Sequence, residues 1–193
     1  AFAMYYGPLH FLTIRVVLEG LAAAGVDLGR THDSGDRGLE RIVDLGCGTG
    51  VGGAAWALAA GGRPSVSGFD LSQWAVDEAD WTLETLGVRG GARRRDLARV
   101  RVPGAGAGVI SAYTINELTD PVRSRLLGRL LDGGDEGARI LVVEPISRRV
   151  SPWWDGWVEA FAERGGRADE WRFLKPLPDL VVELDRASGL RHR

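Results

Sequence analysis

The order of apolar and polar positions predicts alternating strands and helices through the middle of the chain. Short apolar runs with the length of buried strands occupy residues 41–45, 65–70, 92–96, 108–112 and 138–144. Segments with helical spacing separate them at residues 53–60, 72–86 and 121–131. This rhythm predicts an α/β fold of the Rossmann-like, doubly wound type, with a mostly parallel sheet and helices on both faces.

Individual residues set the expected ends of these elements. Ser72 is the expected N-cap of its helix and Gly87 the expected stop. Residues 9–24 have helical spacing and end before Gly25, and residues 29–38 are polar and rich in Gly and Asp, which is typical of an exposed, mobile loop.

The alternation stops after Pro145, where residues 146–176 are rich in tryptophan. Within this segment Trp153 or Trp154, Trp157, Val158 and Phe161 share one helical face. A last helix is expected from Pro178 to about Ser188, with Gly189 as its cap. Residues 190–193 resemble the start of a further strand, so we expect the sheet to lack its final strands here.

We expect a single domain over residues 1–193, in four parts. These are an N-terminal helix and loop (1–38), a cofactor-binding core (39–145), an aromatic-rich insert (146–176), and the last helix with the start of a strand (177–193). Because the sequence begins with Ala rather than Met, we expect it to be a processed or trimmed form of a longer product.

Composition narrows the function classes only slightly. The formal net charge of −2 disfavours a general polyanion binder but leaves local basic patches open. Cys47 is the single cysteine, and the three histidines are far apart, so we expect neither a disulfide nor a metal site. We expect a cytoplasmic protein without membrane segments, since no apolar run has the length of a membrane span and no signal peptide is visible.

The strongest chemical signal follows the first predicted strand. There the sequence reads Asp44-Leu45-Gly46-Cys47-Gly48-Thr49-Gly50 and leads into a helix. Glycines allow positive φ and close approach of a ligand, and the N–H groups at a helix start favour polar or anionic ligand atoms. In an open α/β sheet, ligands collect at the carboxyl ends of the strands.

The glycine loop alone does not decide the ligand. The run from Gly48 to Gly53 also satisfies the dinucleotide fingerprint G-x-G-x-x-G, and Asp70 ends the second strand where either cofactor class needs a ribose-binding carboxylate. A βα turn without any ligand is the plainest alternative. A carboxylate at Asp44 favours a cationic ligand, because beside a pyrophosphate it would be repulsive.

Three segments together resemble the class I S-adenosylmethionine (SAM)-dependent methyltransferases. The run Val43 to Gly50 resembles the first motif of that family, Gly68-Phe69-Asp70-Leu71-Ser72 resembles its second motif, and Arg95-Asp96-Leu97 lies where the family commonly places an adenine-binding acid. The resemblance covers residues 39–145 and implies SAM as cofactor.

Carried over to this sequence, the family pattern assigns a role to each part of the site. The glycines of the loop contact the methionine and ribose parts of SAM, Asp44 orients the loop or the methionine amino group, Asp70 binds the ribose, and Asp96 and Leu97 flank adenine. The complete set of implied cofactor contacts is Asp44, Gly46, Cys47, Gly48, Gly50, Asp70, Leu71, Asp96, Leu97 and Ser111. For Cys47 we expect a small apolar role rather than a nucleophilic one, because no nearby base is visible.

The acceptor is expected at the end of the fourth strand, where the sequence reads Tyr113-Thr114-Ile115-Asn116-Glu117-Leu118. Tyr113 and Glu117 are the candidates for acceptor contact, with Glu117 as a base. Alternatively, Glu117 only caps the following helix and Tyr113 only packs; Glu144 is a similar candidate. This string, followed by Val143-Glu144-Pro145, also resembles a methyltransferase-like family associated with small ribosomal subunits, which implies rRNA besides a small molecule as the acceptor.

The tryptophan-rich insert has two interpretations. It forms a lid or a stacking surface for a planar acceptor, or it is the packing face of a helix or a dimer contact. Arg148 and Arg149 either bind a phosphate or carboxylate or are solvated. The function predicted from the whole sequence is methyl transfer from SAM; the alternatives are a non-catalytic SAM-binding assembly module and an NAD(P)-binding protein.

Overall fold

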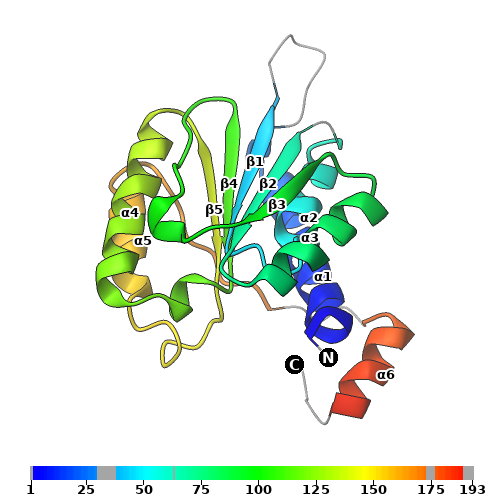
Figure 1. Cartoon of the computed structure of the whole chain (residues 1–193). Helices are drawn as coiled ribbons and strands as arrows, with labels where there is room; N and C mark the ends of the chain where they lie inside the picture. The colour runs from blue at the N-terminus through cyan, green and yellow to red at the C-terminus, as the bar shows by residue number, and fades with distance from the viewer. Residues whose placement is uncertain (1, 30–37, 63, 173–176, 189–193) are drawn as a thin grey trace.

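Five parallel strands form the centre of the computed structural model, which describes residues 2–29, 38–62, 64–172 and 177–188. The strands lie in the order β3-β2-β1-β4-β5 (Figure 1). Their bounds are β1 Arg41–Leu45, β2 Ser65–Asp70, β3 Gly90–Arg94, β4 Ala107–Ala112 and β5 Arg139–Val143. The order reverses between β1 and β4, and such a switch point is where open α/β sheets bind ligands. The fold is therefore the predicted Rossmann-like α/β type.

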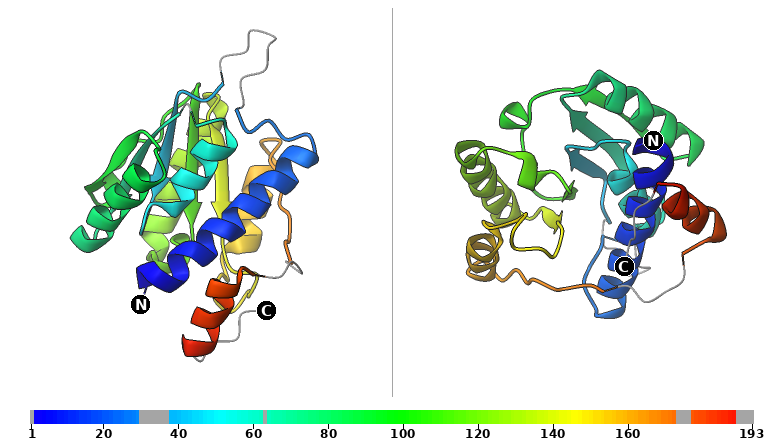
Figure 2. Two further views of the ribbon diagram at one scale, coloured as in Figure 1. Left: turned by 90° about the vertical axis from the view of Figure 1, so that its right-hand side faces the viewer. Right: turned by 90° about the horizontal axis from the view of Figure 1, so that it is seen from below.

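Helices cover both faces of this sheet (Figures 1 and 2). On one side lie α1 (Phe2–Ala23), α2 (Val51–Ala59) and α3 (Gln73–Thr85), and on the other α4 (Asp120–Asp135) and α5 (Trp154–Ala162). Helix α6 (Asp179–Ser188) contacts α1. No helix in the described part of the chain is both long and apolar enough to cross a membrane.

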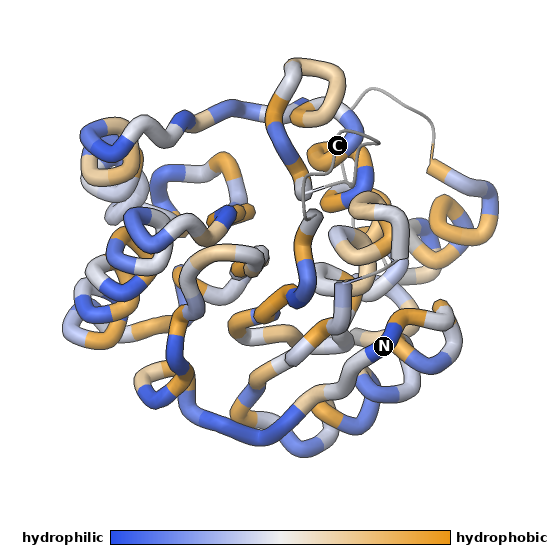
Figure 3. Tube along the Cα trace, turned by 90° about the horizontal axis from the view of Figure 1, so that it is seen from above, coloured by the Kyte–Doolittle hydropathy of each residue, from blue (hydrophilic) through white to orange (hydrophobic). Residues whose placement is uncertain are grey.

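Each face of the sheet has its own apolar core. On the α1–α2 side, Ile14, Leu18 and Trp56 pack with Ile42 and Ile110 of the sheet. The indole N–H of Trp56 donates to the Leu28 carbonyl at 3.1 Å, which satisfies its polar atom inside the core. The hydropathy trace shows apolar positions gathered between the layers (Figure 3).

The second core lies between the sheet and α4 and α5. Leu45 and Val109 of the strands pack against Leu126 and Leu130 of α4 and against Trp157 of α5. The aromatic stripe of the insert thus faces the core. Trp157 is buried, and the guanidinium of Arg123 lies 5.4 Å from the ring centroid of Trp153. The packing interpretation of this stripe is confirmed for these residues.

Local chemistry predicted several elements closely. The first two strands have the expected bounds, and the Ser72 hydroxyl accepts from the Ala75 N–H at 3.3 Å as the N-cap of α3. The helix predicted over 9–24 instead begins at Phe2 and runs through Pro8, because Tyr5 is already buried in the core. Residues 30–37, 189 and 190–193 lie outside the described residues, so the predicted mobile loop, the Gly189 cap and the further strand are not described.

Two other boundaries were wrong for reasons of packing. The third strand begins at Gly90 rather than at residue 92. At Gly90 the two strands lie so close that a Cβ would overlap the Val66 carbonyl of β2. Helix α4 continues to Asp135 through Gly133, whose missing Cβ leaves room for Val102. Close backbone approach thus outweighs the low intrinsic propensity of glycine for both structures.

The connection between β3 and β4 contains only a single short turn, η1 (Leu97–Arg99). In a parallel sheet such a crossover is usually a full helix. Arg129 of α4 holds the turn in place by donating to the carbonyls of Leu97 at 2.9 Å and Val100 at 2.6 Å. On the α4 side of the sheet, β3 therefore lacks a helical cover, whereas α3 packs against it from the other side.

Candidate functional site

The loop after β1 is held tightly between two strands. Gly46, Gly48 and Gly50 have φ values of 70°, 50° and 76°. The N–H groups of Gly46 and Cys47 both donate to the Phe69 carbonyl of β2, at 2.8 and 3.0 Å. The glycines thereby turn the chain from β1 directly into α2 at the carboxyl edge of the sheet.

Gly46 and Gly48 have different surroundings. A Cβ on Gly46 would overlap the Thr114 side chain, whose hydroxyl donates to the Gly46 carbonyl at 3.0 Å. A Cβ on Gly48 would have no atom within 4 Å and would project into open space. Gly46 therefore permits packing of the loop against the end of β4, whereas Gly48 leaves room for a ligand.

Two aspartates flank this loop. Asp44 is buried, and its carboxylate accepts from the Gly53 N–H at 2.7 Å. Burial raises the pKa of Asp44 to about 7. Asp70 accepts from the N–H of Gly48 at 3.0 Å and from that of Ser72 at 2.9 Å. Asp70 thus connects the glycine loop to the end of β2.

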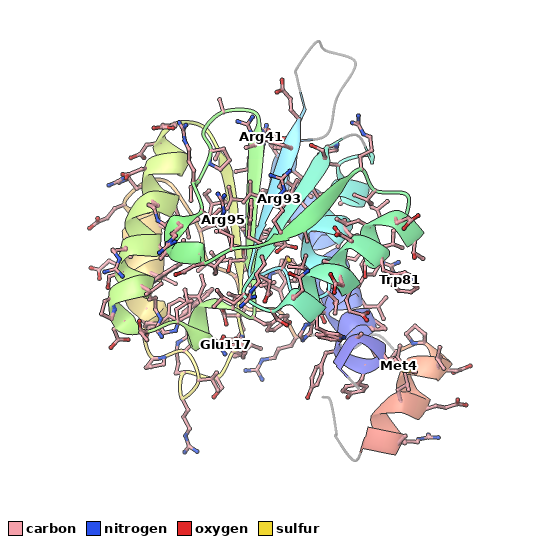
Figure 4. The ribbon with its side chains drawn as sticks, viewed as in Figure 1. Met4, Arg41, Trp81, Arg93, Arg95 and Glu117 are labelled. Atoms are coloured by element: carbon pink, nitrogen blue, oxygen red, sulfur yellow. The ribbon has the colours of Figure 1, made fainter. Side chains whose placement is uncertain are left out.

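A cavity of about 150 Å³ brings most of the predicted residues together. Its walls include Asp44, Asp70 and the loop residues Gly46, Cys47 and Gly48, together with Tyr113 and Glu117, whereas Gly50 does not line it. The cavity therefore lies where the carboxyl ends of β1, β2 and β4 meet, with Glu117 at that edge of the molecule (Figure 4).

Tyr113 has an unusual backbone at the cavity wall. Its φ of 58° is the only positive value among the described residues other than glycine. Its N–H donates to the Val143 carbonyl at 2.8 Å, and burial raises the pKa of its phenol although the Thr13 side chain is hydrogen-bonded to it. Strained backbone of this kind is concentrated at ligand-binding sites.

His10 of α1 completes the same wall and was missed by the sequence analysis. Its ring stacks on Tyr113, with the ring centroids 4.1 Å apart and the planes 20° from parallel. Ile14, one helical turn later, also lines the cavity. No sequence signal linked this helix to the site, because the contact joins residues more than a hundred positions apart.

Glu144 does not face the cavity as an acceptor contact. One of its carboxylate oxygens accepts from the N–H groups of Thr114 at 3.0 Å and Ile115 at 2.7 Å. Burial raises its pKa to about 7, although these hydrogen bonds and one from the Asn116 N–H oppose the shift. Its role is to hold the turn η2 (Ile115–Glu117), which presents Glu117 to the cavity.

A second hollow, of about 650 Å³, adjoins the first. Leu71, Arg94, Arg95, Asp96 and Arg99 line it, and Leu71 directly follows Asp70 of the first cavity. The Asp96 carboxylate accepts from the Ala98 N–H at 2.8 Å at the start of η1. Asp96, the expected adenine contact, lines this hollow, and its role stays a prediction.

Three residues of the predicted cofactor set have mainly structural contacts. Leu97 is buried in the second core, and the hydroxyl of buried Ser111 donates to the Leu45 carbonyl at 3.2 Å. Neither Leu97 nor Ser111 lines either of the two cavities described above. Cys47 lines the first cavity, but its side chain lies where a Cβ on Gly68 would be, and burial raises its pKa. This environment fits the small apolar role expected for Cys47.

Comparison with known proteins finds a protein-family match in the central part of the chain. Residues 42–132 match the family model described as a methyltransferase domain. This match, over just under half of the chain, and the strand order support a class I SAM-dependent methyltransferase domain. The match extends from β1 into α4 and leaves out α1 with His10, β5, and Glu144 directly after β5. No curated protein matches the chain significantly in sequence.

Solved structures of methyltransferases resemble the fold of this chain. The magnesium protoporphyrin IX methyltransferase of Synechocystis PCC 6803 with bound S-adenosylhomocysteine (SAH) is 19% identical with a TM-score of 0.53, over 83% of this chain and 75% of that one. The structure of the same enzyme with bound SAM is 25% identical in sequence, with a TM-score of 0.46, over 64% of this chain and 53% of that one.

A third similar structure has a different substrate. The tRNA (uracil-54, C5)-methyltransferase of Pyrococcus abyssi is 22% identical, with a TM-score of 0.43 over 63% of this chain and 25% of that chain. The chain therefore spans about half or less of the length of two of these three structures. The resemblance to the small-ribosomal-subunit family stays a prediction.

Proposed function

We propose that the protein transfers a methyl group from SAM to an acceptor bound beside Tyr113 and Glu117. The observation that carries this proposal is the cavity itself, whose walls combine Asp44, Asp70 and the glycine loop with Tyr113 and Glu117. The resemblance implies that the first group contacts the cofactor and the second the acceptor.

The residues present fit SAM. The open space beside Gly48 admits a ligand against the backbone, and Asp70 can accept further hydrogen bonds from ribose hydroxyls. The buried Asp44 would regain a full charge next to a cationic ligand. A pyrophosphate in the same place would meet repulsion from Asp44, which disfavours a dinucleotide.

When bound, SAM supplies a methyl group that is already activated on a sulfonium. The protein's part is then to orient the acceptor, to exclude water and to receive a proton. His10 and Tyr113, stacked on each other, form an aromatic wall that excludes water from the acceptor side. Glu117 is the candidate to accept the proton that an acceptor hydroxyl or amine loses.

Calorimetric titration with SAM, SAH and NADH tests the cofactor. We expect SAM and SAH to bind and NADH not to bind. Asp70→Ala should abolish SAH binding, and Asp77→Ala, which removes an exposed carboxylate of α3, should leave it unchanged. Folded protein that binds NADH but neither SAM nor SAH would contradict the proposal.

An acceptor screen with methyl-labelled SAM tests catalysis separately. The panel should contain porphyrins, tRNA and rRNA, in view of the two enzymes named above, together with small hydroxylated and amino compounds. Transfer that disappears in Tyr113→Ala and Glu117→Gln supports the proposed acceptor side. SAM binding without transfer to any compound in the panel would favour the non-catalytic binding module.

A further inference from the structure

The arginines of the chain are unevenly distributed. Residues 89–101 contain six arginines and a single acidic residue, Asp96, although the whole chain has a net charge of −2. Arg93, Arg94, Arg95, Arg99 and Arg101 are all exposed, and none of them forms an ion pair with any described residue. We call these five residues the β3 arginine surface.

Strand register shows why this surface is accessible. Leu45 of β1 pairs with Phe69 of β2, which pairs with Arg93 of β3, so the three side chains point to the same side of the sheet. On that side the crossover after β3 covers Leu45 and Phe69 with Leu97 and Val100 but contains no helix that reaches Arg93. Figure 4 shows Arg93 and Arg95 in front of the sheet.

The proposed cofactor does not account for this charge. SAM carries no phosphate, and its adenosine end is neutral, yet Arg94, Arg95 and Arg99 line the hollow in which that end is expected. The Arg95 N–H donates to the Asp70 carbonyl at 2.8 Å, and its guanidinium lies 5.9 Å from the Phe69 ring centroid. The β3 arginine surface is therefore continuous with the rim of the cofactor site.

We propose that the β3 arginine surface binds the phosphate backbone of a single-stranded nucleic acid, which is the methyl acceptor. The five charges extend along a strand, a turn and the following loop, and such an arrangement matches an extended polyanion better than one phosphate group. Naming the strand as the acceptor rests on the proposed function, whereas the binding itself does not.

A flat anionic surface fits less well, because acidic groups border the arginines. Helix α3 packs beside β3 and carries the exposed carboxylates of Asp77, Asp80 and Glu84; that of Asp80 accepts from the Ala92 N–H of β3 at 2.6 Å. Arg93 and Arg94 are successive residues of β3, so their side chains point to opposite faces of the sheet, and a flat lipid bilayer would not meet both. A single strand follows the arginines alone.

The test uses the full chain and a fluorescent oligouridylate of about 15 nucleotides, a length that spans such a site. Fluorescence anisotropy is recorded between about 50 and 200 mM salt for the wild type, Arg93→Ala/Arg101→Ala and the control Arg172→Ala/Arg186→Ala, which removes two exposed arginines elsewhere. Neither Arg93 nor Arg101 lines either of the two cavities described above, so SAH affinity by calorimetry should be the same in all three proteins.

We expect the loss of two phosphate contacts to reduce the slope of log K against log salt by about 1.4 and the affinity by roughly 25-fold near 0.1 M salt. The control variant should bind like the wild type. Equal binding by both variants, or no binding by a wild type that still binds SAH, would overturn this inference and leave the cofactor proposal intact. Stronger binding to phosphatidylserine vesicles than to the oligonucleotide would overturn it in favour of a membrane, and binding of inorganic phosphate alone would also overturn it.

Discussion

The two glycines at the start of the cofactor loop allow a matched pair of substitutions. Gly46 and Gly48 both have left-handed backbones, so alanine at either position costs about 1–2 kcal/mol of stability from the backbone alone. Only at Gly46 does the new Cβ overlap Thr114, and overpacking of this kind costs typically about 1–3 kcal/mol more. We therefore expect Gly46→Ala to be less stable than Gly48→Ala by about 1–3 kcal/mol.

The two substitutions should separate stability from binding: Gly46→Ala mainly lowers the free energy of unfolding, and Gly48→Ala mainly lowers the affinity for SAH. Urea unfolding followed by tryptophan fluorescence measures the free energy of unfolding, and calorimetry measures SAH affinity. The Cβ of Gly48→Ala would have no atom within 4 Å, and Gly48 lines the cavity, so this variant should lose SAH affinity while remaining folded. The entropy that alanine removes from the unfolded chain is common to both variants and cancels in the comparison.

A double substitution isolates the contact that is responsible. Thr114→Ala removes the two atoms that a Cβ on Gly46 would overlap most closely, Cγ2 and Oγ1. Gly46→Ala should therefore be less costly in the Thr114→Ala background than in the wild type, which gives a favourable coupling energy in the double-mutant cycle. The reasoning is refuted if Gly46→Ala is as stable as Gly48→Ala, or if the cycle shows no coupling.

Three further substitutions test other parts of the site. Because burial raises the pKa of Glu144 from its usual 4.5 to about 7, the stability that its protonation contributes is fully present below pH 4.5 and is lost as the pH rises through 7. Glu144→Gln should therefore gain about 1–3 kcal/mol over the wild type near pH 9 and little near pH 4, measured by urea unfolding; a variant less stable than the wild type near pH 9 would show that the η2 backbone needs the charge. His10→Ala should lose about 1 kcal/mol with its stack on Tyr113, while His10→Phe should keep it; equal losses in thermal unfolding would show that stacking is not responsible. Arg129→Ala leaves the Leu97 and Val100 carbonyls without their donor and should cost about 1–3 kcal/mol in urea, whereas Arg125→Ala, an exposed position on the same helix, should cost almost nothing; a similar loss in both would argue against a role in holding η1.

The cofactor half of the site was predictable because it is local in sequence. The glycine loop, Asp44 before it and Asp70 after the next strand are fixed by short-range chemistry and by the rule that parallel strands end at one edge. The structure brings these residues to one cavity. The N-cap of α3 was likewise predicted from Ser72 alone.

The acceptor half depends on contacts that sequence spacing does not encode. His10 reaches Tyr113 only because α1 packs across α2 at the end of the sheet. Glu144 was one candidate for acceptor contact, but its position relative to η2 depends on the pairing of β4 with β5. Likewise, overall charge concealed the β3 arginine surface, because the average over the chain contains no information on where the arginines lie.

The Thr114 hydroxyl joins the two halves physically, since it donates to the Gly46 carbonyl at 3.0 Å and to the Ala112 carbonyl at 3.1 Å. Any ligand that orders the glycine loop therefore restricts the segment that carries Tyr113 and Glu117 as well. Thermodynamic reciprocity then requires that cofactor and acceptor change each other's affinity by the same factor. We expect this cooperativity to be visible as tighter SAH binding in the presence of the acceptor, and to weaken when Thr114 is replaced by valine, which keeps the shape of the side chain but removes the hydroxyl.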